Sequence, residues 1–223
     1  MDVGYFLKRR TAFIRQLYAT ATHEYVERQC KIEAEEEPFV PPYSEDGDPP
    51  FLEEWLEADD SLQVLGRACL SMLAATLKLY FKTWERELGV PVDDALKKSG
   101  FGRGFVNGYR AYFLSNFGIR FEDGPTDVAL LEEIVLARNG IQHPKTIASN
   151  HSHYTDSDLE KLPHPFFVDD REKSLLAEVD ESQSSWLMPP AIHVSSAKLL
   201  EALSAVERFA EWLEQAELVC RGE

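Results

Sequence analysis

The stretch that decides the fold is SLQVLGRACLSMLAATLKLYFKTWEREL, residues 61–88. Its apolar residues recur every three to four positions, which is the period of an α-helix. The apolar side is wider than a narrow stripe, as is typical of a helix at the centre of a bundle. Ser61 can cap the start of this helix, and Gly89 and Pro91 follow its end. We therefore expect the other helices of the chain to pack around it.

The same helical period recurs on both sides of this central stretch. Further helices are predicted at residues 2–30, 105–117, 126–143 and 195–219, and residues 93–98 can add a short helical segment that is not counted among them. Asp2 can cap the first of them, and Thr126 or Asp127 can cap the helix that follows Pro125. The sequence therefore predicts a mainly α fold, a helical bundle of four main helices plus a short one, in a single domain of residues 1–223.

Two segments lack this period. Residues 31–60 hold twelve acidic residues, one basic residue and five prolines, which predicts an exposed acidic connector with a helical turn around Phe51–Leu56. The alternative for this segment is a partner-binding or self-shielding role. Residues 144–193, rich in His, Asp, Ser and Pro, predict a long irregular insert before the last helix, with short extended pieces at Phe166–Val168 and Ala191–Val194.

The composition excludes several classes of protein. Three distant cysteines without a CxxC pair (Cys30, Cys69 and Cys220) favour neither a disulfide framework nor a zinc site, and indicate a reducing compartment. Neither a secretory signal nor an uninterrupted apolar stretch of about 18 residues is visible, so a cytoplasmic protein is expected. The net charge of −16 argues against broad, non-specific nucleic-acid binding, although a small basic cleft remains compatible with it.

The strongest candidate for a functional motif is LARNGIQHP, residues 136–144, at the end of a predicted helix. Asn139 and His143 are four residues apart and share a helix face. Arg138 and His143 are five apart and point about 140° away from each other on a straight helix. They can meet if the helix loosens at Gly140, or if a second copy of the helix faces the first across a two-fold axis.

The pattern Arg138-Asn139-x3-His143 resembles the mark of the HEPN family (higher eukaryotes and prokaryotes nucleotide-binding domains), which lies on a helix within a helical bundle. From 13 Arg, 6 His and 4 Asn, chance predicts about 0.006 such motifs in a chain of this length. The resemblance implies a metal-independent endoribonuclease that acts as a homodimer, in the setting of a toxin or an anti-phage defence effector. It implies an RNA substrate, an antitoxin or regulatory protein as a further partner, no metal and no cofactor. No membrane partner is expected, because the sequence shows no long apolar stretch.

The resemblance also implies roles for the motif residues. The 2′-hydroxyl of RNA attacks the adjacent phosphate, which leaves a 2′,3′-cyclic phosphate and a 5′-hydroxyl. His143 would exchange the proton, Arg138 would hold the phosphate, and Asn139 would orient His143 or bind a phosphate oxygen. The predicted substrate-binding residues are basic: Arg103, Arg110, Arg120 and Lys145.

Three alternatives remain open. The chain can be a catalytically silent HEPN-like module that dimerises or binds a partner or nucleotide. It can be a helical regulatory protein in which Arg138 pairs with Glu132, Glu133 or the acidic connector. It can also be a metal-dependent hydrolase that uses His151 and His153.

The glycine-rich run GFGRG, residues 100–104, only superficially resembles a phosphate-binding loop. It lacks the Lys-Ser/Thr of a P-loop and a preceding strand. We expect a flexible entry to the next helix.

Overall fold

The computed structural model describes residues 2–42, 49–143, 150–177 and 189–221, with the side chains of residues 175–177, 220 and 221 excepted. Within these ranges the chain is helical and has no strand, so the predicted mainly α class is confirmed. The α-helices are α1 (Val3–Glu33), α2 (Leu52–Leu88), α3 (Asp94–Ser99), α4 (Phe105–Phe117), α5 (Val128–Gln142), α6 (Asp156–Lys161), α7 (Asp170–Ala177) and α8 (Ser196–Arg221). Two short 3₁₀ turns lie at Phe101–Arg103 and Phe121–Asp123.

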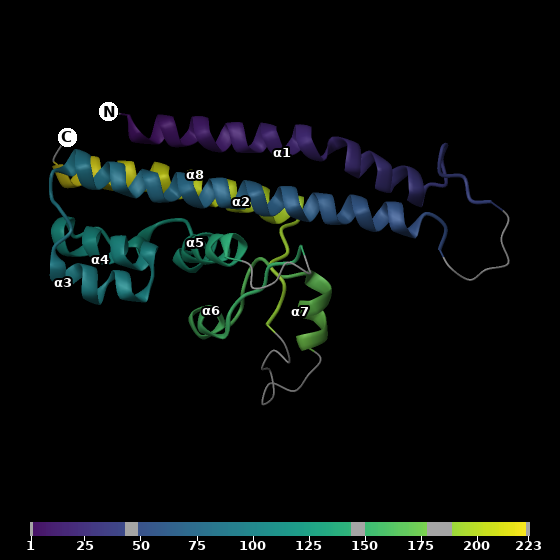
Figure 1. Cartoon of the computed structure of the whole chain (residues 1–223). Helices are drawn as coiled ribbons and strands as arrows, with labels where there is room; N and C mark the ends of the chain where they lie inside the picture. Colours follow the sequence, from purple (N-terminus) through teal and green to yellow (C-terminus); the bar gives the residue numbers. More distant parts are fainter. Residues whose placement is uncertain (1, 43–48, 144–149, 178–188, 222–223) are drawn as a thin grey trace.

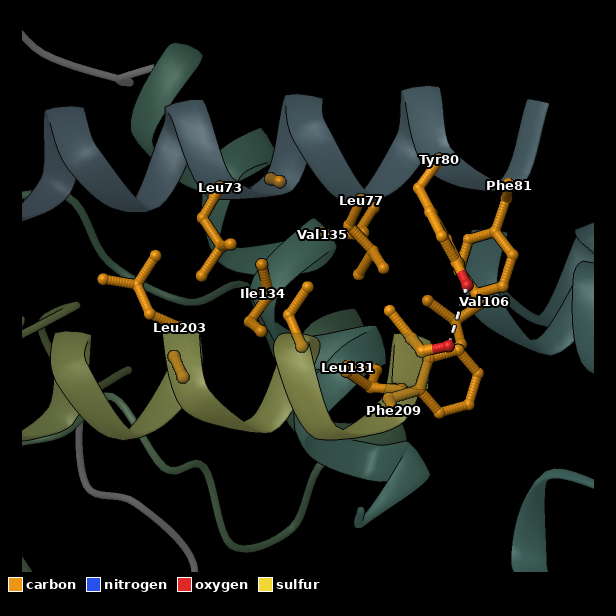
Figure 2. Close-up of a cluster of buried hydrophobic side chains, with 14 of the residues drawn as sticks. Leu73, Leu77, Tyr80, Phe81, Val106, Leu131, Ile134, Val135, Leu203 and Phe209 are labelled. Atoms are coloured by element: carbon orange, nitrogen blue, oxygen red, sulfur yellow. Dashed lines mark hydrogen bonds between the residues drawn. The ribbon is translucent and has the colours of Figure 1, made fainter. Parts of the chain in front are cut away.

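Helix α2 is the centre of the fold, as its wide apolar face predicts. Helix α1 runs antiparallel along one side of it, α8 lies alongside, and α4 and α5 cover a further side (Figure 1). Leu73, Leu77 and Phe81 of α2 are fully buried and lie opposite Leu203 and Phe209 of α8 (Figure 2). Burial of large apolar side chains of this kind stabilises the folded state by about 1.5–3 kcal/mol each.

The predicted helix ends are confirmed where their caps can be seen. The Asp2 carboxylate accepts a hydrogen bond from the Tyr5 N–H at 2.8 Å. Asp127 accepts one from the Ala129 N–H at the start of α5, also at 2.8 Å. Gly89 follows α2 with a φ of 68°, a left-handed conformation that glycine adopts without steric cost.

The acidic connector is shorter than expected, because both flanking helices extend into it. Helix α2 begins at Leu52 and not at Ser61. The extension packs against α1: Ala58 is buried, the Trp55 indole N–H donates to Glu33 at 3.0 Å, and Arg28 pairs with Glu57 at 3.1 Å. Its carboxylates are mostly exposed, and this charged surface hid the helical period in the sequence.

The predicted irregular insert contains two short helices, α6 and α7. The two expected extended pieces do lie together, because the His193 N–H donates to the Phe167 carbonyl at 3.0 Å. They do not form a sheet; the described part of the insert has one isolated bridge, between His153 and Ala191. Phe167 and Val194 are nevertheless fully buried, so the insert belongs to the hydrophobic core.

Helix α2 is also long and apolar enough to span a membrane by composition alone, with a mean hydropathy of 1.3 over its most apolar 18 residues. More than half of this window, 56%, is buried inside the fold. That burial is what a core helix of a soluble protein requires.

Four of the five buried tyrosines among the described residues have the largest rise in pKa and predict unfolding at alkaline pH. Burial raises the pKa of Tyr80, Tyr109 and Tyr154, and raises that of Tyr112 to about 12. An acid with a raised pKa in the folded state stabilises the fold fully below its unfolded pKa, near 10, and loses this contribution as pH rises through the folded pKa. Tyr112 alone then accounts for about 2 kcal/mol by a pH of about 12.

In an alkaline titration above about pH 10, we expect tyrosinate absorbance to increase over the same pH range in which the helical circular dichroism signal is lost. Ionisation of all eight tyrosines near that pH, with the helices intact, would contradict the burial of these four side chains.

Candidate functional site

The three motif residues lie at the accessible end of α5. Residues 131–137 of this helix are all buried, whereas Arg138 is half-buried and Asn139 and His143 are exposed. His143 is the C-cap, and its backbone N–H donates to the Asn139 carbonyl at 3.2 Å. The helix therefore carries the motif from the core to the solvent within two turns.

Within the motif, the structure joins Arg138 to Asn139. The Arg138 Nη1 donates to the Asn139 side-chain oxygen at 3.2 Å. The Asn139 oxygen thus faces the arginine, and among the described residues it does not orient the His143 ring. The side chains of His143 and Arg138 can face each other only if the end of α5 changes its conformation, or if a second copy of α5 faces the first.

Glu132 and Glu133, the two glutamates of α5 that are expected as partners of Arg138, are engaged elsewhere. Glu132 and Glu133 are both buried and turn into the protein. Glu133 accepts hydrogen bonds from the Tyr154 hydroxyl at 2.6 Å and from the Phe166 and Phe167 N–H groups. The described residues therefore leave Arg138 without a carboxylate from its own helix.

Glu132 occupies the glycine-rich entry to α4. Its carboxylate accepts hydrogen bonds from the N–H groups of Phe105 at 3.0 Å and Asn107 at 2.9 Å. Gly104 has a φ of 145°, and a Cβ there would lie 2.4 Å from the Glu132 carboxyl carbon. The helix N-terminus thus holds an anion, as helix N-termini do, but the anion is the protein's own side chain. This occupant explains why the run resembles a phosphate loop without being one.

A lysine from another helix joins the candidate site. Lys78 of α2 is half-buried, with its Nζ 5.4 Å from the centroid of the Phe105 ring. Burial lowers its pKa, the positive charges of Arg138 and Lys82 lower it further, and the Glu132 carboxylate opposes this shift. Three positive charges against one carboxylate leave a local positive potential that attracts an anion such as phosphate.

Sequence reasoning missed Lys78, which lies 60 residues before Arg138 in the chain. One signal was present: Lys78 is the single charged residue between Arg67 and Lys82, in an otherwise apolar run of the central helix. A charge on such a helix needs a tertiary explanation, because burying it costs free energy.

Two of the three predicted substrate-binding arginines, Arg110 and Arg120, have local partners. Arg110 pairs with Glu122, and Arg120 pairs through two nitrogens with Asp123, at 3.1 and 2.9 Å. Arg103 is exposed, and Lys145 lies outside the described residues. RNA would have to displace Glu122 and Asp123 to use these two arginines, so their role stays a prediction.

The alternative metal site at His151–Asp158 is not assembled in the part of the chain that the structure describes. No three His, Cys, Asp or Glu side chains gather there. The Asp158 carboxylate instead caps α6, where it accepts the Thr155 N–H at 2.9 Å and the Thr155 hydroxyl at 2.6 Å.

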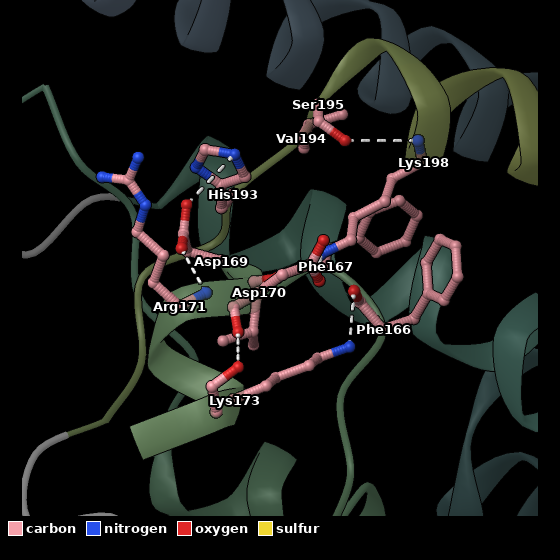
Figure 3. A network of polar contacts seen from close by, with 12 residues as sticks. Phe166, Phe167, Asp169, Asp170, Arg171, Lys173, His193, Val194, Ser195 and Lys198 are labelled. Carbon is pink, nitrogen blue, oxygen red and sulfur yellow. Dashed lines mark hydrogen bonds and ion pairs between the residues drawn. The ribbon is translucent and has the colours of Figure 1, made fainter. Parts of the chain in front are cut away.

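A second polar network joins the insert to α8 and α2 (Figure 3). Lys198 of α8 is buried; it donates to the Val168 carbonyl and to Asp170 at 2.8 Å. The His193 Nε2 lies 3.7 Å from Asp169 and 3.3 Å from the Gln63 side-chain nitrogen. Burial lowers the His193 pKa, which favours the neutral ring. These contacts anchor the insert, and its sequence gave no signal for them.

Comparison with known proteins finds no protein-family model, no curated protein and no solved structure that matches this chain.

Proposed function

We propose that the chain is a metal-independent endoribonuclease of the HEPN type, which acts as a cytoplasmic homodimer in defence or growth arrest. The observation that carries the proposal is the motif Arg138-Asn139-x3-His143 at an accessible helix end. There Arg138 has no carboxylate from its own helix and lies in the electrostatic field of Lys78. A phosphate is the anion that such a pair of cations binds well.

In the proposed reaction, the RNA 2′-oxygen bonds to phosphorus while the bond from phosphorus to the 5′-oxygen breaks. The neutral His143 of one copy accepts the 2′-hydroxyl proton. The protonated His143 of the second copy donates a proton to the leaving 5′-oxygen. Arg138 and Lys78 stabilise the charge that develops on the phosphate oxygens. A two-fold pairing supplies the apposition of Arg138 and His143 that one straight helix denies.

A second candidate is a silent module that binds RNA or nucleotide phosphates without cleavage. The hydrogen bond from Arg138 to Asn139 favours it, because it takes away the group that would orient His143. Both candidates use the same cations and differ only in the chemistry.

The test is incubation of the full chain with a mixed RNA pool in excess EDTA. We expect fragments with 2′,3′-cyclic phosphate and 5′-hydroxyl ends. RNA that is bound but stays intact would assign the chain to the silent module, and the absence of both binding and cleavage would reject the site.

Arg138→Ala is expected to weaken binding of a non-cleavable 2′-deoxy-substituted RNA by about tenfold or more, because it removes a charge-assisted contact of about 1.5–3 kcal/mol. Arg208→Ala is the matched control, since Arg208 is an exposed arginine of α8 that belongs neither to the motif nor to the predicted substrate-binding residues. Fluorescence anisotropy at fixed salt measures both. Equal affinities of the two variants would contradict the role of Arg138.

A further inference from the structure

One contact between α2 and the insert depends on the protonation state of a histidine. Gln63 of α2 is buried, and its side-chain amide reaches two consecutive residues at the end of the insert, His193 and Val194. The Val194 N–H donates to the Gln63 Oε1 at 3.0 Å, and the Gln63 Nε2 lies 3.3 Å from the His193 Nε2. Both ends of one amide group therefore hold this part of the insert on α2.

The hydrogen bond from Val194 fixes the roles of the other atoms. A backbone N–H only donates, so the Gln63 atom that it meets is the oxygen, and the other end of the amide is the NH₂ group. The NH₂ group also only donates, so the His193 Nε2 must be an unprotonated acceptor. A protonated ring carries a hydrogen on both nitrogens and would set two donors against each other at this contact. Rotation of the amide does not remove the conflict, because it turns the NH₂ group towards the Val194 N–H.

Charged groups from the insert, α8 and α2 surround the His193 ring. They are Asp169, Asp170, Lys198 and Asp59. Lys198 already pairs with Asp170, whereas the Asp169 Oδ2 lies 3.7 Å from the His193 Nε2 (Figure 3). Burial lowers the pKa of His193, and the Asp169 carboxylate opposes this shift. A protonated ring therefore has a partner within the insert, in Asp169, and none in Gln63.

We propose that Gln63 and His193 form a pH-sensitive latch, which holds residues 191–194 of the insert on α2 when His193 is neutral and loosens them when it is protonated. In the closed latch, the Gln63 NH₂ group donates to the ring. In the open latch, the ring pairs with Asp169, and the contact between α2 and the insert loses this hydrogen bond. Histidine suits such a switch because its charge changes near neutral pH.

The segment that the latch holds also packs against the helix of the candidate site. A Cβ at Gly140, within the motif, would lie 2.9 Å from the Ile192 side chain and 3.2 Å from the His153 carbonyl oxygen. Ile192 directly precedes His193, so an open latch loosens the packing at the end of α5. An effect of this change on RNA cleavage rests on the proposed function, whereas the latch itself does not.

The first test follows the His193 ring and nearby amides by NMR in the full chain. We expect the pKa of His193 to lie below its ordinary value of 6.5. A lowered folded pKa contributes stability that is present above the unfolded pKa and is lost as pH falls through the folded pKa. The protection of the His193 and Val194 amides against hydrogen exchange should therefore decrease about tenfold or more between about pH 7.5 and pH 5.5, since a buried hydrogen bond is lost.

His193→Gln separates this histidine from every other titrating group. The amide oxygen of glutamine accepts from the Gln63 NH₂ group at any pH, so the protection of the two amides should not change over this range. A wild-type pKa at or above 6.5, or the same loss of protection in His193→Gln, would overturn the proposal.

Gln63→Glu should reverse the pH dependence. A carboxylate has nearly the same shape and still accepts the Val194 N–H, but its second oxygen accepts a hydrogen bond from the protonated ring. The pKa of His193 should then rise above 6.5, and protection should increase as the pH falls. Gln16→Glu is the matched control, because it adds the same charge at an exposed position of α1, and it should behave as wild type. Weakened protection in Gln63→Glu without a change of sign would make this contact merely structural and reject the latch. None of these measurements uses RNA, so their outcome is independent of the proposed nuclease.

Discussion

Replacement of His143 by alanine is expected to lower the rate of RNA cleavage by roughly 10²–10⁴-fold, the usual contribution of a general acid or base. The proposed reaction moves one proton from the 2′-hydroxyl and one to the 5′-oxygen, and alanine can do neither. The fold should be unaffected, because the His143 side chain is exposed and its capping hydrogen bond to Asn139 comes from the backbone.

The measurement compares initial cleavage rates of wild type and His143→Ala in excess EDTA at equal dimer content. His164→Ala is the control, since His164 is another exposed histidine, which lies outside the motif and follows the end of α6. RNA affinity of His143→Ala should match that of wild type, because Arg138 and Lys78 remain.

Equal cleavage rates for wild type and His143→Ala would rule out His143 as the proton carrier. The proposal of a HEPN-type nuclease would then fail, whatever the oligomeric state. Reduced affinity with unchanged turnover would instead place His143 in RNA binding.

The helical fold was predictable because its signals are local. Apolar spacing and capping residues act within a few turns, so α1, α4, α5 and α8 were located from the sequence. The early start of α2 was not, because its first three turns contain many acidic residues and gain their buried contacts only from α1. The docking of the insert was not predictable either, since it depends on contacts between distant residues such as Gln63 and Val194.

The candidate site also has one part that was predictable from local sequence and one part that depends on tertiary packing. The motif on α5 is a local pattern, whereas Lys78 reaches it only through the packing of α2 on α5. The pairing of Arg120 with Asp123 was readable in advance, because the two residues are three apart. The buried pair Glu132 and Glu133 gave an ambiguous signal: acids within an apolar run indicate either a nearby cation or nearby N–H donors, and the structure has the latter.

Helix α5 therefore has two roles. Glu132 and Glu133 are adjacent and accept N–H groups from two different segments, the start of α4 and the insert. The same helix ends in the candidate site one and a half turns later. The hydrogen bonds that hold α5 in position therefore also position Arg138. A substitution that weakens them should affect both the stability of the fold and the geometry of the candidate site.

Glu133→Ala is expected to lower the free energy of unfolding by about 3–5 kcal/mol, because it removes a buried carboxylate that accepts hydrogen bonds from three donors. It leaves the Tyr154 hydroxyl and the N–H groups of Phe166 and Phe167 without their acceptor, and each unsatisfied buried donor costs about 1–3 kcal/mol. The control is Glu160→Ala, an exposed glutamate of α6, with an expected change within about 0.5 kcal/mol. Denaturant unfolding measures both.

Limited proteolysis distinguishes loss of the anchor from general destabilisation. In Glu133→Ala the insert should be cleaved before the helices, because Phe166 and Phe167 lose their link to α5. In Glu132→Ala the link is intact, and the N-terminal turn of α4 should be exposed instead. Identical cleavage patterns for the two variants would contradict separate roles.

Glu133→Gln adds a test by pH. Burial raises the pKa of Glu133 above its ordinary value of 4.5, even though its hydrogen bonds oppose this shift. A raised folded pKa contributes stability that is fully present below the unfolded pKa and is lost as pH rises through the folded pKa. Glutamine does not titrate, so the stability of wild type relative to Glu133→Gln should be greatest below about pH 4.5 and should fall as pH rises. An increase over that range would mean that the hydrogen bonds outweigh burial and lower the pKa of this carboxyl.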